Sequence, residues 1–339
     1  MQRKSNKVLV IDIGNQVVDS KLSDRNLLNY ISHTLLPLYE LVKQCEANGV
    51  KCITPDVFLK DPSSFKEKCV LLISHLTNER TNQIIKAGGK PFLLFCQESP
   101  MIATRFYINF HQLSQPFTYT MAFAGMKRRA HNNTIFIPMH FPIYFETTTT
   151  PSLPFTEKKL LVLIAANKSA PFWKAMLMKL LYGAKVRLIY PIRKNLISNL
   201  TTKKVIDLYG KGWNTDKSEA IRAAYKGLVP ADSKLDTLSK YKFTLCFENA
   251  IFPGYITEKI FDALLAGSVP VYLGDPNILE SIPNNTFIDA REFADTDSLH
   301  HYLDSMSEET YKQYCAYGKE FLTSSAFKKL VIRPLLKRY

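Results

Sequence analysis

A group of polar residues that could bind or react with a ligand lies in the segment from Tyr241 to Gly274. The group consists of Glu248, Asn249, Tyr255, Glu258 and Lys259. Together they offer carboxylates, an amide, a phenol and an ammonium group, which can hydrogen-bond a polar ligand and neutralise an anion. Apolar runs with the composition of buried elements flank the group, so a loop between regular elements must position it.

The spacing of the apolar residues around this group predicts a strand, a helix and a second strand. Alternating apolar residues lead up to Glu248, where the first strand is expected to end. The helix has Thr257 as its expected N-cap and Gly267 as its expected left-handed C-terminal residue. Val269–Leu273 is the second strand. A parallel strand–helix–strand unit places its loop at the carboxyl edge of the sheet, where open α/β folds bind ligands.

The length and composition indicate a soluble protein of two domains. A chain of 339 residues can bury two cores, and 46% hydrophobic with 22% charged residues is ordinary for globular proteins. The sequence has no apolar run long enough to span a membrane, and its basic start reads as a first strand rather than a signal peptide. We therefore expect a cytoplasmic location, with the six scattered cysteines as buried free thiols.

The net charge of +14 predicts a surface that attracts anions. Nucleic acids, anionic lipids and phosphorylated small molecules all belong to this class, and charge alone does not choose among them. The sequence contains no zinc finger, recognition-helix pattern or aromatic RNA-binding signature, so we expect no nucleic-acid partner.

Strands and helices alternate along the chain, and the alternation begins twice. In the first half we expect strands at 7–13, 50–54, 70–74, 91–96, 117–123 and 134–139, and helices at 27–47, 77–87 and 101–113. In the second half, besides the central segment, we expect strands at 159–165, 186–190, 205–209 and 286–289. The Thr- and Pro-rich segment 147–154 is the expected linker. The pattern predicts two doubly wound parallel-sheet domains, residues 1–150 and 151–310.

The remaining residues, 311–339, are expected to form a helical tail in which lysines and arginines accompany apolar residues. One interpretation is a terminal helix that docks back on the body of the protein. The other is an amphipathic patch in peripheral contact with a membrane, at its inner face for a cytoplasmic protein.

The segment Tyr241–Gly274, YKFTLCFENAIFPGYITEKIFDALLAGSVPVYLG, resembles the donor-binding signature of the α-1,3/α-1,4-fucosyltransferases, glycosyltransferase family 10. The family pattern is approximately YKF.L.FEN…YITEK…A…A..VP(V/I)..G. Weaker similarity extends backwards through three short segments, Asp207–Gly210, Phe117–Met121 and Glu98–Pro100. The first ninety or so residues carry no matching motif.

The resemblance implies an enzyme with a GT-B fold, in which two Rossmann-like domains face a central cleft. It implies an inverting, metal-independent transfer of fucose from GDP-fucose to a GlcNAc or glucose hydroxyl of a glycan, in α-1,3 or α-1,4 linkage, as in glycan biosynthesis and protein glycosylation. The implied partners are a GDP-sugar and a glycan acceptor, without cofactor or metal. The donor-contacting positions of the family carry over to Asn249, Tyr255, Glu258 and Lys259.

Physical reasoning gives each of these positions a role. Lys259, in the first turn of a helix whose N–H groups favour an anion, can neutralise charge on the departing GDP. Glu258 suits the ribose or a cationic sugar, and Tyr255 can pack on the donor while it offers its hydroxyl. Asn249 can donate to and accept from sugar or phosphate oxygens. Glu248 is expected to hold the loop by accepting backbone N–H groups.

Glu98 is the expected catalytic base, at the end of a predicted strand in the acceptor-side domain. Inverting transfer requires a group that takes the proton of the acceptor hydroxyl, and partial burial is expected to raise the pKa of Glu98 usefully. The alternative role of Glu98 is to cap the helix that begins near Pro100. His111 and His131 are the alternative bases.

Two further features bear on the donor site. The family has an arginine in the helix after the first strand of the donor domain, where it contacts the diphosphate, but segment 167–174 contains none. Lys168 or Lys174 is the expected substitute, as a point charge in place of a bidentate fork. Two alternatives therefore stay open, a GT-B transferase that uses another GDP-sugar and a catalytically inactive protein that binds a GDP-sugar or glycan.

The sequence Asp295-Thr296-Asp297 matches the D-x-D of metal-dependent glycosyltransferases. Because it precedes a helical run, we interpret it as an N-cap cluster and expect no metal site.

Overall fold

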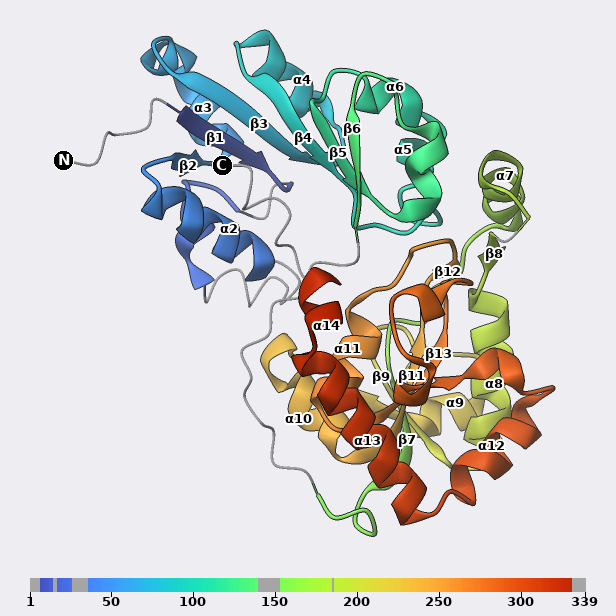
Figure 1. The fold of residues 1–339 in the computed structure, drawn as a ribbon. Coiled ribbons are helices and arrows are strands. Elements are labelled where there is room, and N and C mark those ends of the chain that lie inside the picture. The colour runs from blue at the N-terminus through green and yellow to red at the C-terminus, as the bar shows by residue number, and fades with distance from the viewer. Residues whose placement is uncertain (1–6, 15–16, 26–35, 140–152, 185, 331–339) are drawn as a thin grey trace. The chain divides into compact units, whose positions relative to one another are not determined.

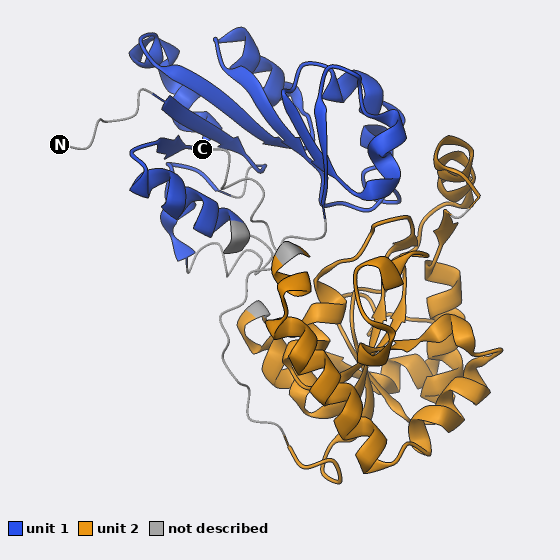
Figure 2. Cartoon of the chain, viewed as in Figure 1, with its two compact units in different colours: residues 1–144, 331–339 blue, residues 145–330 orange. Residues whose placement is uncertain are grey.

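The structure is a computed structural model that describes residues 7–14, 17–25, 36–139, 153–184 and 186–330. Two compact units divide the chain, one of residues 1–144 with 331–339 and one of residues 145–330 (Figure 2). Most of the predicted linker and residues 331–339 of the predicted tail lie outside the described residues.

Unit 1 is built on a six-stranded parallel sheet with the order β2-β1-β3-β4-β5-β6 (Figure 1). Its strands are β1 (Lys7–Asp12), β2 (Lys51–Ile53), β3 (Cys69–His75), β4 (Lys90–Phe95), β5 (Tyr119–Ala122) and β6 (Ile135–Pro138). Its helices are α2 (Leu36–Ala47), α3 (Pro55–Lys60), α4 (Glu79–Lys86), α5 (Thr104–Ile108) and α6 (Phe110–Ser114). The predicted strands of the first half are thus confirmed, with β1 between β2 and β3.

The helix predicted at 101–113 is confirmed in part, because the structure has two short helices there, α5 and α6. Asn109 separates α5 from α6 with φ −96° and ψ 12°, outside the helical region. Its side-chain amide donates to the backbone carbonyl of Arg105 at 3.0 Å. Asparagine competes in this way with the helical hydrogen bonds of the backbone, which periodicity alone does not reveal.

Unit 2 contains a second six-stranded parallel sheet, with the order β10-β9-β7-β11-β13-β14. Its strands are β7 (Lys159–Ile164), β9 (Ile206–Tyr209), β10 (Tyr225–Gly227), β11 (Tyr241–Phe247), β13 (Val269–Leu273) and β14 (Ile288–Asp289). Its helices are α7 (Phe172–Tyr182), α8 (Tyr190–Thr202), α9 (Glu219–Ala224), α10 (Lys234–Ser239), α11 (Glu258–Leu265), α12 (Thr296–Asp304), α13 (Glu308–Thr323) and α14 (Ser325–Leu330). Two parallel α/β sheets confirm the predicted fold class.

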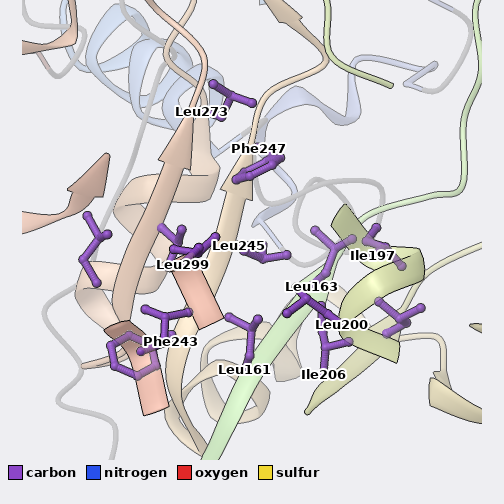
Figure 3. Close-up of a cluster of buried hydrophobic side chains, with 14 of the residues drawn as sticks. Leu161, Leu163, Ile197, Leu200, Ile206, Phe243, Leu245, Phe247, Leu273 and Leu299 are labelled. Carbon is purple, nitrogen blue, oxygen red and sulfur yellow. The ribbon is translucent and has the colours of Figure 1, made fainter. Parts of the chain in front are cut away.

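The main core of unit 2 lies between its sheet and the helices α8 and α12 (Figure 3). Leu161 and Leu163 of β7 meet Ile197 and Leu200 of α8, and all four side chains are buried. Leu299 of α12 belongs to the same cluster. Because helices cover the parallel strands, the strands read as continuous apolar runs in the sequence.

The strand predicted at 186–190 does not join the main sheet. A short strand β8 (Arg187–Leu188) instead pairs antiparallel with β12 (Ala250–Ile251) in a separate two-stranded sheet. Tyr190 and Pro191 open α8, since proline suits the first turn of a helix. The helix that leads from β7 to β9 and packs on the main sheet is therefore α8. Helix α7 and strand β8 are inserted between β7 and α8.

The central segment folds as predicted around α11. The helix is followed by Gly267 in the left-handed region, with φ 64°. The N–H of Ser268 donates to the carbonyl of Ala263 at 3.0 Å, and the N–H of Gly267 donates to that of Leu264 at 3.2 Å. This pair of bonds is the Schellman arrangement, which satisfies the last carbonyls of the helix before β13 begins.

The part of the predicted tail that the structure describes packs on unit 2. The Tyr311 hydroxyl of α13 donates to the carbonyl of Gly267 at 2.7 Å. Phe327 of α14 lies with its ring centroid 5.7 Å from that of Phe261 in α11. For residues 311–330 the docked interpretation is therefore confirmed.

Candidate functional site

The predicted polar loop lies at the topological switch point of unit 2. β7 lies inside the sheet, with β9 on one side and β11 on the other. The connections after β7 and β11 leave the carboxyl edge of the sheet in opposite directions, which is where open α/β sheets bind ligands. Glu248 follows β11 directly, and Ala165 follows β7.

Glu248 organises the connection between β11 and α11. Its side chain is fully buried, and its Oε1 accepts the Thr257 N–H at 2.7 Å. Its Oε2 accepts the Thr257 hydroxyl at 2.8 Å and Lys259 Nζ at 2.9 Å. The structural role predicted for Glu248 is confirmed.

Thr257 occupies the N-cap position of α11, but its side chain does not cap the helix. Its hydroxyl donates to Glu248 instead. The carboxylate of Glu248 therefore lies at the N-terminus of α11, where the helix dipole favours negative charge. Thr257 is thus the N-cap residue, as predicted, but part of the anion-binding capacity expected of this helix is already used by Glu248.

Lys259 is a largely buried cation whose side chain is 14% exposed. Its ammonium donates to Glu248 Oε2 at 2.9 Å and to Thr257 Oγ1 at 2.8 Å. Burial alone would lower the pKa of Lys259, but the carboxylates of Glu248 and Glu258 raise it above its usual value, so the group stays charged. A lysine ammonium has three donors, and these two bonds leave one for a ligand oxygen.

Lys234 of α10 is a second buried lysine at this site, and the sequence analysis missed it. Its Nζ lies 2.6 Å from Asp262 Oδ2 and 3.9 Å from Glu258 Oε1. The same Glu258 oxygen lies 3.9 Å from Lys259 Nζ, so Glu258 stands between two ammonium groups. Glu258 and Asp262 are four residues apart on one face of α11. Two carboxylates on the buried face of a helix need a cation as partner, so their spacing was the sequence signal for a buried lysine.

Arg193 is the second residue that the sequence analysis missed. It lies in the first turn of α8, is 2% exposed, and donates to the carbonyl of Ala166 at 3.0 Å. Its guanidinium carbon is 5.2 Å from the ring centroid of Tyr190. Burial lowers the pKa of Arg193, and its charge opposes protonation of Lys259.

Arg193 forms no ion pair with any carboxylate in the described part of the chain. A buried cation normally has an anionic partner, because desolvation of an uncompensated charge is costly. Arg193 is therefore a buried cation at the switch point without an ion-pair partner among the described residues, which favours an anionic ligand.

The prediction that the helix after the first strand of the donor domain lacks an arginine was made for the wrong helix. Segment 167–174 leads into α7, whereas the helix on the sheet is α8, which contains Arg193. Lys168 is exposed in the connection before α7, and Lys174 lies on α7 with its ammonium 6.0 Å from the ring centroid of Trp173. As far as the structure is described, neither lysine contacts Glu248 or Lys259.

Asn249 and Tyr255, both predicted donor contacts, come together beside this cluster. Asn249 Nδ2 is 3.5 Å from the Tyr255 hydroxyl, and Tyr255 is 2% exposed. The connection after β13 passes so closely that a Cβ at Gly274 would stand 2.5 Å from Glu248 Cγ and 2.3 Å from the Tyr272 hydroxyl. Only glycine fits at this position without moving Glu248.

Glu98 lies in unit 1, beyond the carboxyl end of β4, and is half-buried. Its backbone carbonyl accepts the Tyr107 hydroxyl at 2.8 Å. The N-cap position of α5 is Ala103, without a side-chain cap. The alternative bases His111 and His131 lie together, with ring centroids 4.7 Å apart.

Unit 1 has its own switch point, between β1 and β3, and charged residues are buried there too. Asp12 at the end of β1 is fully buried and accepts from Arg80 Nη2. It also accepts from Asn78 Nδ2 at 3.2 Å and from the Thr81 hydroxyl at 3.4 Å. At the end of β3, burial lowers the pKa of His75 to about 4.

The D-x-D sequence is a helix cap, as predicted. Asp295 accepts the Ser298 N–H at 2.8 Å in a capping box at the start of α12. Across the described ranges, His, Cys, Asp and Glu side chains form no group of three or more that could hold a metal ion. No described helix combines the length and the apolar character that crossing a membrane requires.

Residues 187–332 match the family described as glycosyltransferase family 10 (fucosyltransferase), C-terminal part. The chain is 32% identical over 152 residues to alpha-(1,3)-fucosyltransferase B of Drosophila melanogaster, which covers 43% of this chain and 34% of that protein. It is 40% identical over 100 residues to the mouse 4-galactosyl-N-acetylglucosaminide 3-alpha-L-fucosyltransferase 9, which covers 28% and 26%. The matched part of the chain thus spans about a third or less of these relatives.

Among solved structures, an α1,3-fucosyltransferase with GDP aligns with a TM-score of 0.53 at 17% identity, over 97% of this chain and 92% of that one. Anabaena Alr3699/HepE in complex with UDP-glucose aligns with a TM-score of 0.55 at 10% identity, over 98% and 97%. At these identities the similarity establishes the fold alone. Together with the two parallel sheets, it confirms the GT-B class.

Proposed function

We propose that this chain, whose residues 187–332 match glycosyltransferase family 10, belongs to that family and transfers fucose from GDP-fucose to a GlcNAc or glucose hydroxyl of a glycan. The observation that carries the proposal is the pair of buried cations, Lys259 and Arg193, at the switch point inside the family-matched segment. A nucleoside diphosphate supplies the negative charge that Arg193 lacks, and Lys259 has one further N–H donor for it. The α-1,3 or α-1,4 linkage is part of the same proposal.

The two cations act on the leaving group. During transfer, the bond between the anomeric carbon and the phosphate oxygen breaks, and negative charge grows on the diphosphate of GDP. The remaining N–H donor of Lys259 and the guanidinium of Arg193 stabilise that charge from fixed positions. Glu248 acts through Lys259, because it fixes the ammonium at 2.9 Å and keeps it protonated. Two fixed cations supply what a divalent ion supplies elsewhere, which is our reason to propose a metal-independent transfer.

The remaining residues of the site hold the donor. Glu258 is 20% exposed, with one carboxylate oxygen 3.9 Å from each of the two lysine ammonium groups, and it suits a ribose hydroxyl or the cationic sugar. Asn249 and Tyr255 offer an amide and a phenol to the sugar or phosphate oxygens. These roles agree with the family signature that the residues match.

Glu98 is the proposed base. In an inverting transfer the acceptor oxygen forms its bond to the anomeric carbon on the face opposite the departing GDP, and its proton passes to a base. Glu98 is a half-buried carboxylate at the carboxyl edge of the sheet of unit 1. It takes the proton, and GDP leaves with the electron pair of the broken bond.

An assay of GDP release tests this function. With GDP-fucose and oligosaccharides that carry GlcNAc or glucose, we expect acceptor-dependent release of GDP that EDTA does not abolish, and NMR of the product should show the inverted, α-configured fucose. Glu98→Gln should abolish transfer and retain GDP binding. Near-normal turnover of Glu98→Gln contradicts the assignment of the base.

Thermal stabilisation by nucleotide sugars separates the alternatives. A ligand at about a hundred times its dissociation constant adds about 2.7 kcal/mol of stability. Turnover of GDP-mannose without turnover of GDP-fucose would favour another GDP-sugar transferase. Stabilisation by GDP-fucose without any transfer would favour an inactive binding protein.

A further inference from the structure

Helix α7 presents an apolar face to solvent. Its residues Phe172, Trp173, Met176 and Leu180 are 76%, 54%, 62% and 82% exposed. Positions 172, 176 and 180 recur every four residues and position 173 adjoins the first, so the four side chains lie on one side of the helix. We call these four residues the α7 face.

The α7 face is not the side by which the helix is attached to its unit. Ala175 and Met178 are buried, and the ring centroid of Tyr182 lies 5.4 Å from that of Phe252. Figure 1 shows α7 at the margin of unit 2, beyond β8 and α8. The helix also precedes the family-matched segment, which begins at residue 187. An apolar face that neither the core nor the family signature uses requires another explanation.

The surroundings of the α7 face are positively charged. From residue 166 to residue 187 the chain contains five Lys or Arg residues and no Asp or Glu. Lys168, before the helix, and Lys179, on it, are exposed. The ammonium of Lys174 lies 6.0 Å from the ring centroid of Trp173. Basic residues beside exposed aromatic and aliphatic side chains are the composition of a helix that lies in a membrane interface.

We propose that the α7 face docks on the surface of an anionic lipid bilayer. The four apolar side chains enter the boundary between headgroups and acyl chains, where aromatic rings are favoured, and the lysines contact lipid phosphates. With 11 residues, α7 lies in the plane of the membrane, because spanning takes about twenty. A second copy of the chain is a poorer partner, since it would bring the same positive charge to the contact.

Co-sedimentation with vesicles tests the proposal, which does not depend on the proposed function. We expect the chain to bind vesicles of 30% phosphatidylglycerol in phosphatidylcholine, and to bind vesicles of phosphatidylcholine alone more weakly. The variant Met176→Glu/Leu180→Glu should lose at least about tenfold in affinity, because two apolar anchors become anionic. Lys168→Gln and Lys179→Gln should each lose about fivefold, and added salt should reproduce this loss.

The matched control is Leu279→Glu. Leu279 lies in unit 2 and is 62% exposed, as is Met176, so the control places a similar charge at a similarly exposed apolar position. It should bind vesicles as the unaltered chain does. Circular dichroism melting confirms that each variant folds, which is expected because the altered side chains are on the surface.

Several outcomes overturn the proposal. Absence of vesicle binding, or equal binding by Met176→Glu/Leu180→Glu, removes the α7 face as a membrane contact. Sedimentation of the unaltered chain as a dimer that this variant dissociates assigns the face to a second copy. Binding to duplex DNA that the lysine variants weaken and Met176→Glu does not would assign the charge to nucleic acid.

Discussion

The switch points of the two sheets both bury charged side chains, but their charges balance differently. In unit 1 the Asp12 carboxylate is matched by the Arg80 guanidinium and supplemented by two neutral donors. In unit 2 the Glu248 carboxylate is matched by Lys259, and Arg193 adds a second cation. In the first cluster the ion pair is complete, whereas in the second Arg193 has no carboxylate partner among the described residues.

The difference suggests what each cluster does. A buried group whose partners are all in the protein supports the fold and gives a ligand no electrostatic reason to bind. A buried cation without a carboxylate is stabilised when an anion arrives. The same topology thus holds a structural cluster in one unit and the proposed donor site in the other. Lys234 and Asp262 form a further ion pair beside the donor site.

The largest effect is expected at Lys259. Lys259→Met should lower transfer by about a hundredfold to a thousandfold, because charge on the departing GDP loses its donor. It should also lower the free energy of unfolding by about 3–5 kcal/mol, because Glu248 stays buried without its partner. Initial rates and urea unfolding measure the two effects.

The double variant Glu248→Gln/Lys259→Met separates the effects. It removes both charges, so stability should return towards that of the unaltered chain while transfer stays low. Recovery of transfer in the double variant would mean that Lys259 only neutralises Glu248, and the proposed difference between the switch points would fail.

Arg80→Ala tests the cluster of unit 1. It should destabilise unit 1 by about 3–5 kcal/mol, because buried Asp12 loses its cation. The affinity of unit 2 for GDP should stay unchanged. Hydrogen exchange read separately for β1, β3 and β11 measures the stability of each unit. Protection lost equally in β11, or a marked loss of GDP affinity, would contradict the division of roles.

Acid should weaken unit 1 through His75. The pKa of His75 is about 4 in the folded protein, against about 6.5 for an unfolded chain, so the unfolded state binds more protons between these values. The contribution of neutral His75 to the free energy of unfolding is therefore fully present above pH 6.5. It declines by about 3 kcal/mol as the pH falls from 6.5 to 4. His75→Gln should flatten the pH dependence of exchange in β3. An unchanged slope in this variant would assign the acid sensitivity to other groups.

The central segment could be predicted from the sequence because its pattern is local. Alternating residues in β11, helical spacing in α11 and the glycine after the helix each act within a few residues, and Glu248 was placed correctly at the strand end. The strands of unit 1 were predictable for the same reason. Asn109, by contrast, interrupts a helix where the spacing of the apolar residues predicts a continuous one. Its side-chain amide donates to the carbonyl of Arg105.

The missed residues depend on contacts that the sequence does not encode locally. Lys234 meets Asp262 across two elements, and α10 is too short to give a clear period. Arg193 was overlooked because α7, the first helix after β7, was taken for the helix on the sheet. Only packing distinguishes α7 from α8, since both have apolar periodicity and just one fills the core.

The most direct test of the central claim is calorimetric titration of GDP into the unaltered chain and into Arg193→Met. This substitution leaves no carboxylate of the described residues unpaired, so the fold should be retained. We predict that Arg193→Met binds GDP at least about tenfold more weakly, because charge-assisted hydrogen bonds contribute about 1.5–3 kcal/mol, and that GMP affinity changes less. Equal GDP affinities for the two proteins would contradict the claim that Arg193 at the switch point of unit 2 binds the diphosphate.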